Sequence, residues 1–125
     1  DLNQWRRIID MHAVDIVQAD LCYIGGLSRA LRVAGMAAEA GMICVPHSAN
    51  RSMVTVFTLH MLGATANAGP HFEFSIEATP WTEGLFAPAL QVRDGQVNIP
   101  DGPGWGVVVS QKWLTASERR ISELD

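Results

Sequence analysis

Apolar and polar side chains follow one another along the first 77 residues in blocks that predict helices and strands in alternation. Two blocks repeat apolar residues at helical spacing, and a third is apolar over most of a helical circumference, which predicts burial on more than one side. Three shorter blocks have the length and composition of strands. The predicted helices span residues 2–11, 28–41 and 52–66, and the predicted strands span residues 13–19, 42–45 and 71–76. The first helix has no expected capping residue before it, so we expect a further segment upstream.

The pattern changes after residue 77, where proline, glycine and tryptophan become frequent. Two alternating runs flank Asp94 and Gly95, and an Asp-Gly pair in that position is a strong signal for a β-hairpin. We expect that hairpin over residues 90–99, a turn-rich passage over 100–106, a short strand over 107–109 and a polar helix over 117–124.

Three ionisable side chains stand at similar places in the three predicted strand regions. Asp20 closes the first, His47 follows the second, and Glu73 lies in the third, with 27 residues between the first two positions and 26 between the last two. Each interval has the length of one strand-helix unit of a parallel sheet. The carboxyl ends of parallel strands meet at one edge of a sheet, which is the usual place for catalysis in α/β folds.

The pair Asp20 and His47 has two interpretations. A carboxylate bonded to one ring nitrogen of a histidine fixes its tautomer and makes the other nitrogen a proton acceptor, which is the arrangement of a catalytic dyad. Neighbouring parallel strands lie about 4.8 Å apart, so side chains at their ends can touch. The alternative is a structural histidine beside an aspartate that caps a loop. Of the other histidines, we expect His12 to be solvated and His60 to pack in a helix, while His71 remains ambiguous.

Glu73 stands between Phe72 and Phe74 in a strand that we expect to be buried. A buried carboxylate is costly unless it is protonated, hydrogen-bonded or paired. It is either a third member of the site or a structural group bonded to a cation from another part of the protein.

Composition narrows the functional classes. The chain has 125 residues and a net charge of −4, and Lys112 is its only lysine, which argues against a nucleic-acid partner. It has neither 18 consecutive apolar residues nor a signal-peptide pattern, so we expect a soluble cytoplasmic protein with no membrane association. Cys22 and Cys44 lie in apolar runs without a metal-binding spacing, which favours two buried free thiols.

Several motifs together resemble a known family. They are Asp15-Ile16-Val17-Gln18-Ala19-Asp20, Ile24-Gly25-Gly26-Leu27, Val45-Pro46-His47-Ser48, Phe72-Glu73, Arg93-Asp94-Gly95 and the turn-rich passage from Pro100 to Gly106. The chain is similar to the C-terminal part of the enolase superfamily, mandelate racemase subgroup. The resemblance implies an α/β fold in which residues 1–77 supply about strands six to eight of a modified (β/α) barrel. Residues 78–125 would be an extension returning towards a capping domain, and that domain and the earlier strands would precede this chain.

The resemblance also implies a reaction. Family members use Mg²⁺ to stabilise the enediolate formed when the proton α to a carboxylate is removed, and the three metal ligands would lie upstream, with none in this chain. His47 would exchange the proton, Asp20 would orient His47, and Glu73 would donate a hydrogen bond as a neutral acid. Members of the muconate-cycloisomerase kind have lysine at the position of Asp20.

We expect the substrate to be a small carboxylate and the reaction to be dehydration of a sugar acid. The alternatives are a racemase or epimerase of a 2-hydroxy acid and a non-catalytic structural or oligomer-forming module. A homo-oligomer is also expected.

Overall fold

The computed structural model describes residues 1–77 and 79–123. The chain folds into two compact units, Asp1–Glu77 and Ala78–Asp125, each of which has its own set of elements. Within the described residues, no helix has both the length and the apolar character needed to cross a membrane.

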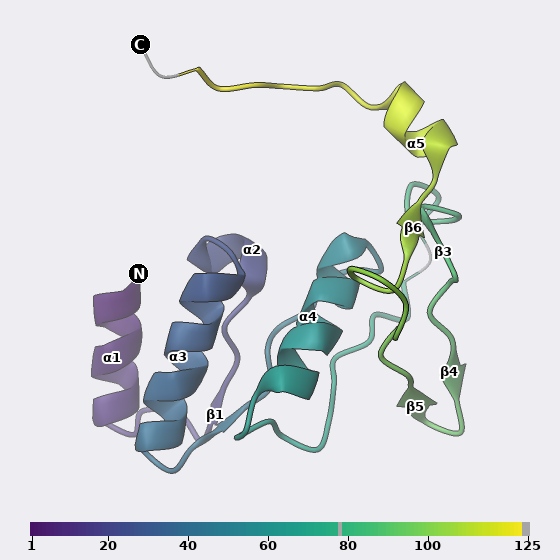
Figure 1. Ribbon diagram of the computed structural model, residues 1–125. Helices are drawn as coiled ribbons and strands as arrows, with labels where there is room; N and C mark the ends of the chain where they lie inside the picture. The colour runs from purple at the N-terminus through teal and green to yellow at the C-terminus, as the bar shows by residue number, and fades with distance from the viewer. Residues whose placement is uncertain (78, 124–125) are drawn as a thin grey trace. The chain divides into compact units, whose positions relative to one another are not determined.

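Helices and strands alternate in the first unit, largely as the sequence predicts (Figure 1). Its elements are α1 (Leu2–Asp10), β1 (Ile16–Val17), α2 (Leu21–Ile24), α3 (Leu27–Glu39), β2 (Ile43–Cys44) and α4 (Met53–Ala64). The three longer helices lie where they were expected, and the two strands are shorter than predicted. Asp1 caps α1, because its carboxylate accepts a hydrogen bond from the Gln4 amide at 2.9 Å. The expectation of an uncapped first helix is therefore wrong.

The two strands pair in parallel, with Ile16 opposite Ile43 and Val17 opposite Cys44. A parallel bridge from Cys44 to Ala68 extends the pairing to a third stretch of chain. The Cys44 amide donates to the Asn67 carbonyl, and the Gly69 amide donates to the Cys44 carbonyl, both at 2.9 Å. Strand order therefore follows chain order, as in consecutive strand-helix units.

The third predicted strand does not form, since residues 71–77 have no strand pairing in the structure. The parallel bridge ends as the chain enters Pro70, which has no amide hydrogen to offer a ladder. Contacts with the loop after β2 hold the segment beyond Pro70, and they involve Ser48 and Arg51.

The core lies where α1, α3 and α4 meet the two strands. Figure 1 shows α3 beside α1, and the two helices are in contact. The small residues Ala30, Ala34 and Ala37 of α3 are buried, which lets this helix approach the sheet closely. The fully or almost fully buried side chains include Ile9, Val17, Val33, Cys44, Val56 and Met61. This packing fixes the ends of β1 and β2, where the site residues lie.

The second unit is built from short antiparallel pairs and one short helix. Its elements are β3 (Phe86–Ala87), β4 (Val92–Arg93), β5 (Gln96–Val97), β6 (Val108–Val109) and α5 (Gln111–Ala116). β3 pairs with β6, and β4 with β5 as the predicted hairpin. Asp94 and Gly95 form its turn with φ of 51° and 74°, as a two-residue turn of type I′ requires.

The predicted helix over residues 117–124 is wrong for the part that the structure describes, because residues 117–123 are not helical. Residue 124 lies outside the described residues. Ile121 is the single apolar side chain in 117–123 and is 65% exposed, so a helix there would bury no apolar face. The helix of this region is α5, which ends at Ala116, just before the predicted helix begins. The indole of its Trp113 donates a hydrogen bond to the Glu83 carbonyl at 3.2 Å.

Candidate functional site

Asp20 lies just after β1 and begins the short helix α2. One carboxylate oxygen, Oδ1, accepts hydrogen bonds from the amides of Cys22 at 2.7 Å and Tyr23 at 3.1 Å. These contacts make Asp20 the N-cap of α2. Gly25 ends the helix in the left-handed region, with φ of 95°, a conformation that glycine adopts without steric cost. This helix was not predicted, although Asp20 followed five residues later by Gly25 is a recognisable start and stop signal.

The second carboxylate oxygen of Asp20 contacts His47. Oδ2 lies 2.7 Å from Nδ1 of the imidazole, so the predicted hydrogen bond is present. The Asp20 side chain is only 7% exposed, whereas that of His47 is 39% exposed. The contacts of both interpretations are therefore present at Asp20, since Oδ1 caps a helix while Oδ2 contacts the histidine.

His47 is placed by the sheet. The amide of Val45, just beyond β2, donates to the Val17 carbonyl at 2.9 Å, which keeps the ends of both strands in register. Pro46 is fully buried and precedes the half-buried His47. Two parallel strands ending at one edge thus bring Asp20 and His47 together across 27 residues of sequence.

Glu73 lies on the other side of the imidazole. Its Oε2 is 3.8 Å from Nε2 of His47 and accepts a hydrogen bond from the Ser48 amide at 3.1 Å. The expectation that Glu73 is buried in a strand is wrong, because its side chain is 46% exposed and the segment forms no ladder. Phe72 and Phe74 are half-buried and meet edge to face, with ring centroids 6.4 Å apart. Burial of the two rings does not extend to the carboxylate between them.

A hollow of about 320 Å³ opens beside the dyad. Asp1, Trp5, Gln18, Asp20, Tyr23, Ile24 and His47 line it. The volume lies within the range of small-molecule sites, and its lining combines aromatic, apolar and polar groups. Gln18 was not among the predicted site residues, although alternation along a strand places residues 18 and 20 on the same side.

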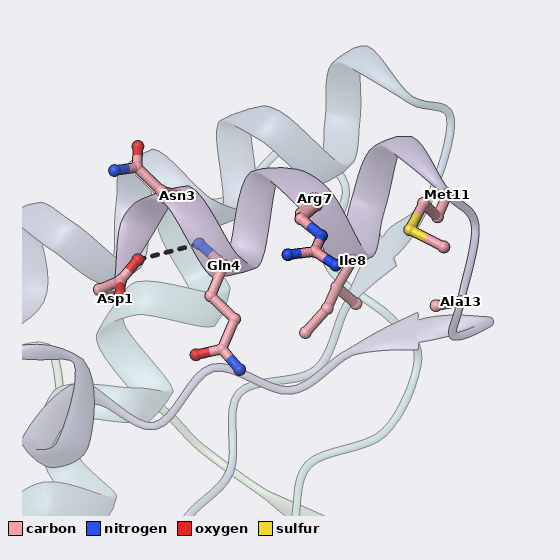
Figure 2. A pocket seen from close by; sticks show the side chains of 7 residues that line it. All are labelled: Asp1, Asn3, Gln4, Arg7, Ile8, Met11 and Ala13. Atoms are coloured by element: carbon pink, nitrogen blue, oxygen red, sulfur yellow. Dashed lines mark hydrogen bonds between the residues drawn. The ribbon is translucent and has the colours of Figure 1, made fainter.

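A second hollow, of about 600 Å³, runs along α1 and contains none of the three predicted site residues (Figure 2). Arg7 is the one cationic side chain among its lining residues, and Met11 in the same wall is 69% exposed. No histidine lines this hollow, whereas Asp20 and His47, though not Glu73, line the smaller one. The hollow beside His47 is therefore the better candidate for proton transfer.

Residues 1–113 match the family described as enolase C-terminal domain-like. The chain belongs to this family. Its fold is the C-terminal part of an enolase-type barrel, as the sequence predicted.

Two curated relatives of this enolase-type chain carry the names of enzymes that act on sugar acids or their lactones. An arabinonate dehydratase from Saccharolobus solfataricus is 27% identical over 106 residues, which cover 85% of this chain and 28% of that protein. A D-galactarolactone cycloisomerase from Agrobacterium fabrum is 32% identical over 110 residues, which cover 82% of this chain and 29% of that protein. The chain thus spans less than a third of the length of either relative.

Solved structures agree on the fold. A proposed racemase from Roseobacter denitrificans superposes with a TM-score of 0.91 at 51% identity, covering 99% of this chain and 35% of that one. An enolase from Pantoea ananatis, solved with bound D-gluconate and magnesium, superposes with a TM-score of 0.77. The match covers 92% of this chain and 28% of that one. Its identity of 19% shows likeness of fold alone.

One of these solved structures contains magnesium, a cation that prefers oxygen ligands. Among residues 1–77 and 79–123, no group of three or more His, Cys, Asp or Glu side chains could hold a metal ion. The carboxylates of Asp20 and Glu73 both contact His47, and each accepts a hydrogen bond from a backbone amide. The described residues therefore do not form a magnesium site by themselves.

The side chains of the remaining histidines and of the cysteines differ in exposure. His12 and His71 are exposed, and His60 is half-buried on α4. Both cysteines are free, as expected, but only Cys44 is buried. Cys22 is exposed, so its predicted burial is wrong: it lies on the outer side of α2. Burial raises the pKa of the Cys44 thiol from 9.0 to about 11, which keeps it neutral at physiological pH.

Proposed function

We propose that the complete protein containing this chain removes the proton α to the carboxylate of a small acid, and that His47 exchanges this proton. One observation carries the proposal: Asp20 holds Nδ1 of His47 at 2.7 Å while Nε2 remains available on a side chain that is 39% exposed. A positioned acid or base of this kind contributes about 10²- to 10⁴-fold to a proton transfer.

The path of the proton follows from the tautomer. When Nδ1 carries the hydrogen and donates it to Oδ2 of Asp20, Nε2 has a free lone pair and can accept a proton from carbon. The resulting imidazolium is stabilised by the same carboxylate, which stays ionised. His47 can then return the proton to the substrate or give it to a departing hydroxyl group.

Glu73 is proposed as the third member of the site. Its Oε2 lies 3.8 Å from Nε2, so it borders the space that a substrate bound at His47 would enter. The backbone amide of Ser48 fixes that oxygen at 3.1 Å. A carboxyl group there can orient a substrate oxygen relative to the reacting carbon.

Dehydration of a sugar acid is the outcome that we propose. It requires His47, once protonated, to deliver its proton to a β-hydroxyl group, so that water leaves. The similarity to an arabinonate dehydratase over 85% of the chain supports this outcome. The second candidate is racemisation or epimerisation of a 2-hydroxy acid, favoured by the 51% identity to a proposed racemase. Both outcomes begin with the same removal of the α proton.

Residues outside this chain would hold magnesium if the protein uses it. The Pantoea ananatis enolase carries that ion, whereas the described residues of this chain offer no cluster for it. The domain division that we propose is a catalytic segment over residues 1–77, which holds all three site residues, followed by an extension.

Exchange of the α proton with solvent tests the proposal. The complete protein is incubated in D₂O with a panel of sugar acids and 2-hydroxy acids, and deuterium at the α carbon is followed by NMR. Wild type should exchange the α proton, and His47→Asn should not. His12→Asn is the matched control, because His12 is exposed in the turn between α1 and β1. Undiminished exchange in His47→Asn would remove His47 from the role of base.

A further inference from the structure

Glu73 faces His47 without support from a β-ladder, so other contacts must fix its position. Residues 71–77 form no strand, and the last parallel bridge lies at Ala68. The Glu73 side chain is 46% exposed, so burial does not hold it either. The contacts that reach this segment come from the loop between β2 and α4.

Arg51 in that loop contacts the segment twice. Its Nε donates a hydrogen bond to the Ser75 carbonyl at 2.7 Å, two residues beyond Glu73. Its guanidinium carbon lies 5.5 Å from the centre of the Phe74 ring, within the range of a cation–π contact. Arg51 therefore holds both the backbone and the apolar side of the segment next to the carboxylate.

The loop that carries Arg51 is itself fixed to α4. The Ser52 amide donates to the Asn50 side chain at 3.0 Å, and the Thr55 hydroxyl donates to the Asn50 carbonyl. The Ser48 hydroxyl bonds to Thr55 at 3.3 Å, and both residues are buried. Arg51 thus belongs to a loop that is hydrogen-bonded to α4 and that also carries His47.

We infer that Arg51 is a positioning residue that sets the distance between Glu73 and His47; this inference rests on the function proposed above. Arg51 touches neither His47 nor the Glu73 carboxylate, and it acts through Ser75 and Phe74. Without it, the hydrogen bond from the Ser48 amide and the contact with His47 would be left to hold Glu73. Misplacement of a site group by about 1 Å can cost on the order of 10²-fold in rate.

Two variants of the complete protein test the inference. Arg51→Met removes the donor and the cation at similar length, and kcat should fall by about 10- to 100-fold. Arg51→Lys keeps a cation and an N–H donor group, so it should recover part of the lost rate. Arg32→Met is the matched control, since Arg32 is exposed on α3, and it should match wild type.

A double-mutant cycle separates positioning from general damage. In a Glu73→Ala background, Arg51→Met should lower kcat by less than about twofold, because a residue that acts through Glu73 has nothing left to position. Effects that multiply in the double variant would overturn the inference. They would show that Arg51 supports His47 or the fold instead.

Hydrogen exchange at the Ser48 amide provides a readout that does not depend on turnover. That amide donates to Glu73, so Arg51→Met should accelerate its exchange towards the rate seen in Glu73→Ala. Unchanged protection would refute the inference even if wild type proves active. Accelerated exchange in a protein that exchanges no α proton would support the positioning role while the proposed function fails.

Discussion

Asp20→Asn should separate catalysis from stability, because the two oxygens of Asp20 serve two different structures. An asparagine can keep its carbonyl oxygen towards the amides of Cys22 and Tyr23, so α2 retains its cap. Asparagine and aspartate are about equally good N-caps. The amide NH₂ then faces Nδ1 of His47 in place of Oδ2.

That reversal changes the tautomer of His47. Since the new NH₂ donates to Nδ1, the imidazole hydrogen moves to Nε2, and Nε2 can no longer accept a proton. We expect α-proton exchange to fall by about 10²- to 10⁴-fold, which corresponds to about 3 to 5 kcal/mol of activation free energy. The free energy of unfolding should change by less than about 1 kcal/mol, since one hydrogen bond replaces another.

Asp20→Ala should differ by losing both functions. It removes the cap, which is typically worth about 1 kcal/mol, and it leaves Nδ1 of a half-buried histidine without its partner. We expect unfolding free energy to fall by about 2 kcal/mol in total and exchange to fall at least as far as in Asp20→Asn.

The assay compares α-proton exchange in D₂O with urea unfolding of the complete protein. Asp15→Asn is the matched control, because Asp15 is an exposed carboxylate that precedes β1 and should change neither quantity. Wild-type exchange in Asp20→Asn would refute the reasoning, since it would mean that Nε2 is not the atom that takes the proton.

Two further predictions concern Glu73 and the cysteines. Glu73→Gln keeps the acceptor for the Ser48 amide and should retain measurable turnover. Glu73→Ala should lower kcat by at most about 10²-fold. That loss is smaller than the loss of a fully buried donor, because the Glu73 side chain is 46% exposed. Equal kcat in both variants and wild type would make Glu73 structural. For the cysteines, a thiol-specific colour reagent at pH 8 should label Cys22 in the native protein and Cys44 only after unfolding. The reason is that Cys44 is buried and has a pKa of about 11, so its reactive thiolate is scarce at pH 8. Native labelling should vanish in Cys22→Ser and persist in Cys44→Ala; rapid labelling of Cys44 in the folded protein would contradict its burial.

The longer helices and the hairpin were predictable from the sequence. α1 and α3 each bury an apolar face, α4 is apolar over most of its circumference, and the hairpin turn at Asp94 and Gly95 has the residues that its positive φ angles demand. The strand over 71–76 and the helix over 117–124 were not predictable in this way. In both cases local composition resembles the expected element, but a strand needs a bonded partner and a helix needs a face to bury.

The pairing of Asp20 with His47 was predictable because it depends on topology. Two parallel strands in register end at one edge, so residues one strand-helix unit apart meet there whatever the intervening helix contains. Glu73 differs because it belongs to no ladder, and its place depends on the Ser48 amide and on the contacts of Arg51. A motif centred on Glu73 gives no signal for an arginine 22 residues earlier.

The choice between a catalytic and a structural Asp20 could not be made from sequence because the two roles do not exclude each other. A carboxylate has two oxygens with separate lone pairs, and here Oδ1 meets two backbone amides while Oδ2 meets an imidazole. The cap fixes the carboxylate plane, and a fixed plane points Oδ2 at Nδ1. Since α2 begins at the very residue that orients His47, a change that unwinds α2 should also release His47, and stability of this helix becomes a condition for the proposed chemistry.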